Sequence, residues 1–101
     1  MVMSERRVGV LVVTLEEAKL YLKVDGDEDD TLITDLIYAA EELSQDILRC
    51  QLTDFTLVPE TVKQAVLYAI GNIYEQRETV DMTALIAVMS RLLFAYRREG
   101  W

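Results

Sequence analysis

The stretch PETVKQAVLYAIGNIYEQR, residues Pro59–Arg77, constrains the fold more than any other part of the chain. Its apolar residues recur at intervals of three and four, which is the pattern of one helix face. Pro59 opens the stretch where the missing backbone N–H has no intrahelical partner to lose. Leu67 and Tyr68 add apolar surface outside that face. We therefore predict a helix that is contacted from several sides, around which the other segments pack.

Three further segments carry helical signals. Thr14 and Glu17 form a capping box at the start of a short helix, and Asp81 or Thr83 can cap the last helix. Gly71, inside the central helix, is typical of a close approach by another backbone. No convincing pair of strands is present, so we predict an all-α fold, a compact bundle of about four helices. The expected helices span about 14–22, 31–49, 59–77 and 82–98.

The first thirteen residues read as an extended arm on a single domain of 101 residues. Val8–Val13 is apolar and β-branched, as in a short strand. It either packs along the helices or pairs with another chain. The run is too short to span a bilayer and has no signal-peptide cleavage site. We expect a soluble, cytoplasmic protein without membrane contact.

The composition excludes the common catalytic sites. The chain has no histidine, no Gly-rich phosphate loop and only one cysteine, Cys50, which we expect to be a partly buried apolar residue near a helix end. The net charge of −8 disfavours a dedicated nucleic-acid-binding surface. We expect no enzyme, no cofactor and no catalytic residue.

The acidic turn DGDEDD, residues Asp25–Asp30, resembles the start of a calcium loop, because aspartates alternate at its first, third and fifth positions. The pattern then fails, since Asp30 stands where glycine is required and Leu36 where a glutamate is required. We interpret the turn as a solvated loop in which Asp29 or Asp30 caps the next helix, and we expect no metal site. An acidic metal-binding module is the weakest alternative for the whole chain.

The helix over 31–49 carries acidic side chains off its apolar stripe, among them Asp35, Glu41 and Glu42. Between Asp25 and Asp46 there is no basic residue. These carboxylates form either a solvated face or a surface that meets a basic partner or repels DNA. Between this helix and the next, Phe55 and Leu57 are expected to enter the core.

Three stretches, taken in order, resemble the small head–tail connector proteins of long-tailed double-stranded DNA phages, often labelled DNA-packaging proteins. They are VTLEEAKLYLKVDGDEDDTLITDLIYAAEELSQDIL (13–48), PETVKQAVLYAIGNIYEQRE (59–78) and SRLLFAYRR (90–98). In this family a proline usually precedes the closing tyrosine–arginine pair, and here Ala95 takes its place. We therefore expect the last helix to continue further than in the family.

The resemblance implies a structural subunit of a ring, dodecameric in the virion neck, that is assembled in the host cytoplasm. Such a ring lies beneath the portal protein, extends the DNA channel without specific DNA binding, and offers a platform to a downstream head-completion or tail protein. A helical adaptor for a bacterial protein is the alternative. The candidate site residues are Tyr68, Tyr74 and Arg77 for contacts between subunits, Phe94, Tyr96, Arg97, Arg98 and Trp101 within a docking segment 94–101, and Asp35, Glu41 and Glu42 for the lumen.

Overall fold

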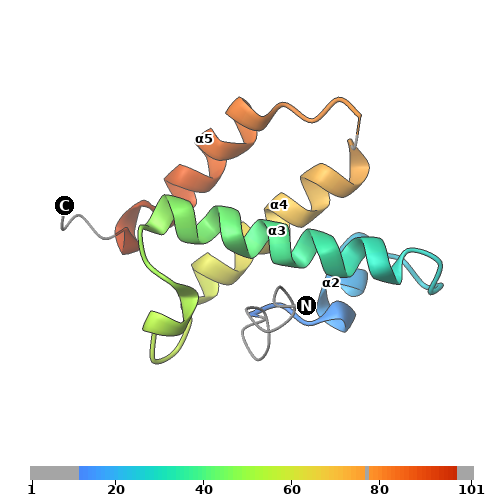
Figure 1. The fold of residues 1–101 in the computed structure, drawn as a ribbon, viewed down its shortest axis with the longest axis horizontal. Helices are drawn as coiled ribbons and strands as arrows, with labels where there is room; N and C mark the ends of the chain where they lie inside the picture. Colours follow the sequence, from blue (N-terminus) through green and yellow to red (C-terminus); the bar gives the residue numbers. More distant parts are fainter. Residues whose placement is uncertain (1–11, 77, 98–101) are drawn as a thin grey trace, which may run out of the picture.

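The computed structural model describes residues 12–76 and 78–97. Over these residues the fold is all-α, as predicted, and no strand occurs in them. In the described part of the chain four α-helices are joined by short connections; one 3₁₀ turn lies between the second and third helices and another follows the last helix (Figure 1). The elements are α2 (Leu15–Leu22), α3 (Asp30–Leu48), η1 (Leu52–Asp54), α4 (Glu60–Glu75), α5 (Met82–Leu93) and η2 (Phe94–Tyr96).

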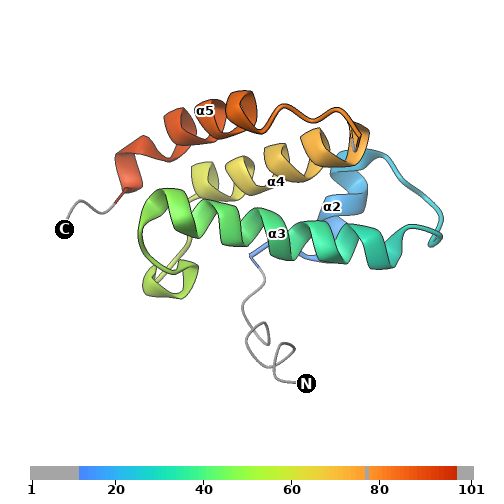
Figure 2. The same cartoon turned by 45° about the horizontal axis from the view of Figure 1, so that its top comes forward.

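Helices α3, α4 and α5 lie side by side with alternating chain direction, and the short α2 crosses one end of the α3–α4 pair (Figures 1 and 2). α2 packs on α3 and α4, and α5 packs on the same two helices from another side. α4 therefore contacts all three other described α-helices, which confirms the prediction of a central helix. Its fully buried residues include Val62, Val66 and Ile70, spaced four apart.

The start of α2 follows the predicted capping box. The Thr14 hydroxyl accepts the backbone N–H of Glu17 at 3.1 Å, and the Glu17 carboxylate accepts the backbone N–H of Thr14 at 3.0 Å. The helix ends at Lys23, whose φ of 62° is left-handed, two residues before the Asp25-Gly26 turn. A left-handed residue reverses the chain direction and so terminates the helix.

Gly71 in α4 does approach another part of the chain, but the neighbour is a side chain and not a backbone. A Cβ placed on Gly71 would lie 2.9 Å from Cε2 of Tyr21. The missing side chain therefore lets the aromatic ring of Tyr21 come close to α4, where α2 packs on the central helix.

The last helix is shorter than predicted. Asp81 caps it, since its carboxylate accepts the backbone N–H of Ala84 at 3.1 Å. The α-helix stops at Leu93, and the 3₁₀ turn η2 follows before Arg97 becomes extended. Replacing the family's proline by Ala95 thus does not prolong the α-helix to residue 98. The tighter turn brings Tyr96 edge-on against Phe55, with ring centroids 6.4 Å apart.

In the connection between α3 and α4, both Phe55 and Leu57 were predicted to enter the core, and the prediction is correct for one of them. Phe55 packs against the core, whereas Leu57 is 85% exposed. The backbone N–H of Leu52 is held by Gln45 Oε1 at 2.9 Å, so the connection is fixed at its start by α3. Cys50, just after α3, is partly buried against the core, as predicted.

Candidate interaction surfaces

Glu41 does not belong to the exposed acidic surface that the sequence suggested. It is only 5% exposed, and its Oε2 accepts the backbone N–H groups of Val12 and Val13 at 2.5 and 3.3 Å. Desolvation raises the pKa of this carboxyl group, and the two backbone hydrogen bonds oppose that rise. Glu41 therefore anchors the end of the N-terminal arm to α3.

The arm itself can be followed only from Val12. Val13 is fully buried and Val12 packs partly against the core, so this end of the arm lies along the helices. The remainder of the predicted arm, residues 1–11, lies outside the described residues.

Asp35 and Glu42 are exposed on α3, in agreement with the predicted acidic face. They are seven residues apart, which places them on the same side of a helix. Asp46 is also exposed and follows Glu42 by four residues, so it extends the same line. The exposed acidic stripe of α3 is thus Asp35, Glu42 and Asp46. The helical spacing of positions 35, 42 and 46 was enough to predict that Asp46, and not Glu41, is the third residue of this stripe.

Two residues of the acidic turn make side-chain contacts with other helices. Asp29 Oδ2 accepts the hydroxyl of Tyr74 at 2.6 Å, and Asp30 pairs with Lys19 at 2.6 Å. Asp29 occupies the N-cap position of α3, but its side chain makes no capping hydrogen bond. Within 12–76 and 78–97, no three acidic or cysteine side chains gather closely enough to hold a metal ion.

Two ion pairs attach α2 to the longer helices. The hydrogen bond with Asp30 raises the pKa of Lys19. Lys63 pairs with Glu17 at 2.5 Å, and this hydrogen bond lowers the pKa of Glu17 and raises that of Lys63. Both pairs are partly solvated, so they orient α2 more than they stabilise it.

The predicted subunit-contact residues on α4 are not free surface residues. Tyr68 and Tyr74 are half-buried and pack against the core, and the Tyr74 hydroxyl is engaged by Asp29. Arg77, the third candidate, lies outside the described residues.

The predicted docking segment is only partly described. Phe94 is 65% exposed, whereas Tyr96 packs partly against the core and on Phe55. Nε of Arg97 is buried and makes no hydrogen bond with the described residues. Arg98 and Trp101 lie outside the described residues.

Besides Phe94, which the sequence had already indicated as a docking residue, α5 exposes apolar side chains that sequence reasoning assigned to no contact. These are Met82 and Ile86, together with several alanines. Met82 and Ile86 are four residues apart and lie on the same side of α5, and we call these two residues the α5 face. Arg91 is exposed as well, but it follows Ile86 by five positions and lies on another side of the helix. The near absence of charge from Met82 to Tyr96 was the available signal, since an ordinary solvated helix face is polar.

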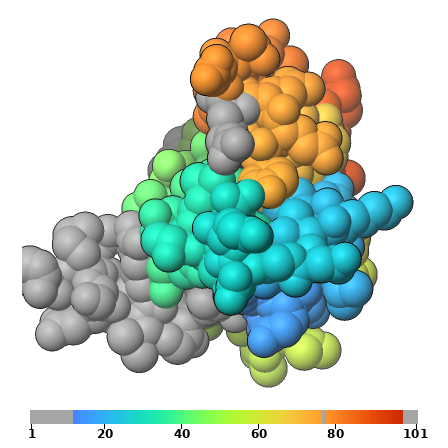
Figure 3. All heavy atoms as spheres, turned by 90° about the vertical axis from the view of Figure 1, so that its right-hand side faces the viewer, coloured from blue at the N-terminus to red at the C-terminus, as the bar shows by residue number. Residues whose placement is uncertain are grey.

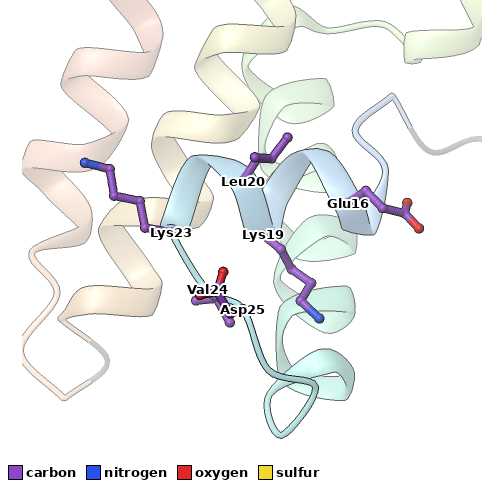
Figure 4. A pocket seen from close by; sticks show the side chains of 6 residues that line it. All are labelled: Glu16, Lys19, Leu20, Lys23, Val24 and Asp25. Atoms are coloured by element: carbon purple, nitrogen blue, oxygen red, sulfur yellow. The ribbon is translucent and has the colours of Figure 1, made fainter.

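A second apolar surface lies on α2. Leu20 is 79% exposed, and Tyr21 is exposed beside it. Leu20 borders a shallow hollow of about 570 Å³ with Glu16, Lys19, Lys23, Val24 and Asp25 (Figure 4). In this view Glu16 points away from the helix and Lys23 points toward the side of α4 and α5. We call Leu20, Tyr21 and this hollow the α2 face.

The acidic turn borders the α2 face. Figure 3 shows the turn between α2 and α3 projecting from the end of the molecule next to α2. Asp25 belongs to both the hollow and the turn. The α2 face therefore combines exposed apolar side chains with charges of both signs, since Lys19 and Lys23 line the hollow together with Glu16 and Asp25.

None of the described helices has the length and apolar content that a membrane-spanning helix requires.

Comparison with known proteins gives one match. Residues 12–97 match the family described as phage gp6-like head-tail connector protein. No curated protein and no solved structure matches the chain. The matched range begins at the anchored end of the arm and ends with the residue after η2, so it covers every described helix. The chain belongs to the phage gp6-like head-tail connector family.

Proposed function

We propose that this protein is a structural, non-catalytic subunit of a ring in the neck of a phage or prophage virion. The ring lies beneath the portal protein, continues the DNA channel and presents a platform for the next head-completion or tail protein. The chain acts as a single connector unit of 101 residues that is assembled in the host cytoplasm. The observation that carries this proposal is the family match over residues 12–97.

Two features of the described surface support assembly. Exposed apolar residues gather on the α5 face and on the α2 face, more than an isolated small subunit needs. A subunit in a closed ring contacts a neighbour on each of two sides, and these contacts can cover such surfaces.

Electron microscopy of the purified protein, alone and mixed with the portal protein of the same phage, tests the proposal. We expect rings on the portal, dodecameric when the portal is dodecameric. A chain that stays monomeric or dimeric under both conditions, and that instead binds a host protein, would favour the adaptor alternative.

The exposed acidic stripe of α3 is our candidate for the channel lining. Negative charge repels the DNA backbone, so a lumen lined by Asp35, Glu42 and Asp46 lets DNA slide without binding. Changing these three residues to lysine should slow DNA ejection from assembled virions. Lysine at the exposed residues Asp27, Glu28 and Glu75 is the control with the same change of charge. Equal rates of DNA ejection in the two triple variants would show that the stripe does not line the lumen.

The segment 94–101 is our candidate for docking on the portal. An exposed Phe94 close to arginines has the composition of an interface anchor. A chain shortened after Leu93 should lose portal binding while it keeps its helical content. Portal-bound rings formed by the shortened chain would refute this assignment.

A further inference from the structure

Two of the three most exposed large apolar side chains in residues 12–76 and 78–97 lie at one end of the molecule. Leu57 is 85% exposed in the connection between α3 and α4, and Phe94 is 65% exposed at the start of η2. Figures 1 and 2 both show this connection and η2 at the same end of the longest axis, with the acidic turn at the other end. We call Leu57 and Phe94 the end pair.

An aromatic contact joins the two segments that carry the end pair. The rings of Phe55 and Tyr96 meet edge-on, with their centroids 6.4 Å apart. Leu57 follows Phe55 by two residues, and two residues of chain span at most about 7 Å. Phe94 likewise precedes Tyr96 by two residues. The Cα atoms of the end pair are therefore less than about 30 Å apart, so both side chains fit within one standard interface patch of about 800 Å² per partner.

The connection holds Leu57 outward on a fixed backbone. Phe55 before it and Val58 after it both pack against the core. The buried Leu52 anchors the connection further, and Gln45 Oε1 accepts its backbone N–H at 2.9 Å. A side chain displayed on a preorganised backbone can bind a partner with little further loss of conformational entropy.

The position of Leu57 distinguishes it from an ordinary surface leucine, because single exposed apolar residues are common on proteins. Leu57 lies at the end of the molecule at which the docking segment 94–101 begins, and that segment starts with the exposed Phe94. A partner that covers Phe94 is therefore brought next to Leu57.

We propose that Leu57 and Phe94 dock together on the portal protein, so that the connection between α3 and α4 forms part of the docking surface beside segment 94–101. This inference rests on the portal docking proposed above and adds the connection to it. The partner surface is apolar, with room for a leucine and an aromatic side chain. A ring presents the end pair once per subunit, so a modest contact is repeated around the ring.

Co-sedimentation of the full chain with the purified portal protein tests the end pair. Leu57→Gln makes the connection polar, and Phe94→Gln does the same at η2. Leu20→Gln is the matched control, because Leu20 is 79% exposed on α2, outside the end pair. Circular dichroism and thermal unfolding verify that the three variants keep the fold.

Leu57→Gln and Phe94→Gln should each weaken portal binding at least about tenfold, as expected when one apolar anchor of an interface is lost. Leu20→Gln should bind the portal like the unmodified chain. Hydrogen exchange gives a readout that needs no variant. When the unmodified chain binds the portal, the amide hydrogens of Thr56 and Leu57 should exchange more slowly.

The failing outcomes are distinct. Unchanged portal binding by Leu57→Gln would overturn the inference and leave docking by segment 94–101 standing. An equal loss of binding in Leu20→Gln would also overturn it, since the effect would not be specific to this end. A Leu57→Gln chain whose self-association without the portal is altered would place this leucine between copies instead. An unmodified chain that does not bind the portal would overturn the proposed function and this inference with it.

Discussion

Glu41 accepts the backbone N–H of Val12 across 29 positions of sequence, with Oε2 2.5 Å from the amide nitrogen. This contact joins the end of the N-terminal arm to the middle of α3. The carboxylate is buried, and its two described hydrogen-bond partners are main-chain groups. A buried charged group that accepts such bonds fixes the position of the segment that donates them.

The contact makes stability depend on pH in an unusual direction. Burial raises the pKa of Glu41 above its ordinary value of 4.5, so the folded chain holds this proton more tightly than the unfolded chain. The contribution of Glu41 to the free energy of unfolding is therefore largest below pH 4.5 and falls as the pH rises through the folded pKa. In urea unfolding over a pH series, the stability of the unmodified chain relative to Glu41→Gln should fall in that window. A relative stability that rises with pH would contradict the assignment.

Removing the carboxylate should destabilise the fold. Glu41→Ala leaves the partly buried N–H group of Val12 and the buried N–H group of Val13 without their acceptor, at a cost of about 1–3 kcal/mol. Glu42→Ala is the matched control, because the neighbouring glutamate is exposed and its loss should change stability by less than about 0.5 kcal/mol. Chemical denaturation measures both. Equal effects of the two substitutions would show that the buried contact is unimportant.

Tyr74→Phe should lower stability by about 0.5–3 kcal/mol, the range for a hydrogen bond whose acceptor is charged or neutral. The change removes the hydroxyl that donates to Asp29 and keeps the aromatic ring against the core. A double-mutant cycle with Asp29→Ala isolates the pair. Additive effects in that cycle would mean that the hydrogen bond makes no net contribution.

The effect of Gly71→Ala on thermal stability should depend on the residue at position 21. Alanine improves helix propensity by about 1 kcal/mol, but its Cβ would lie 2.9 Å from the ring of Tyr21. In a Tyr21→Ala background the clash is absent, so Gly71→Ala should raise the thermal midpoint there. With Tyr21 in place the gain should be smaller or reversed. The same gain in both backgrounds would show that the ring moves aside at no cost.

Alanine substitutions at two nearby residues, Asp81 and Thr83, test which of them caps α5. Asp81→Ala removes the side chain that holds the Ala84 N–H and should cost about 0.5–2 kcal/mol. Thr83→Ala changes an exposed residue inside the first turn and should be nearly neutral. Thermal unfolding distinguishes them, and a larger loss for Thr83→Ala would contradict Asp81 as the cap.

Local patterns predicted the helices well, because their signals are short-range. The Thr14–Glu17 capping box and the Asp81 cap lie within four residues of the groups they satisfy, and Pro59 directly precedes α4. The end of α5 was less predictable. Just after this end Tyr96 meets Phe55, a contact between residues 41 positions apart that local propensity does not include.

The candidate surfaces were only partly predictable for the same reason. The sequence placed Glu41 off the apolar stripe with the other acidic residues, and only the fold shows that the end of the arm covers it. Tyr74 looked like spare apolar surface on α4 until the acidic turn supplied Asp29. Conversely, Leu57 has the composition of a core residue but lies in a connection that no helix covers.

The anchor of the arm has a consequence for how this family can vary. Glu41 binds amide groups, which every amino acid except proline provides, so this bond is indifferent to the side chains at positions 12 and 13. The side chains at these positions can therefore be substituted to suit the packing of the core without loss of the hydrogen bonds to Glu41. Among related chains we therefore expect an acidic residue at position 41 and no proline at positions 12 and 13. We expect no second position whose residue type varies together with position 41.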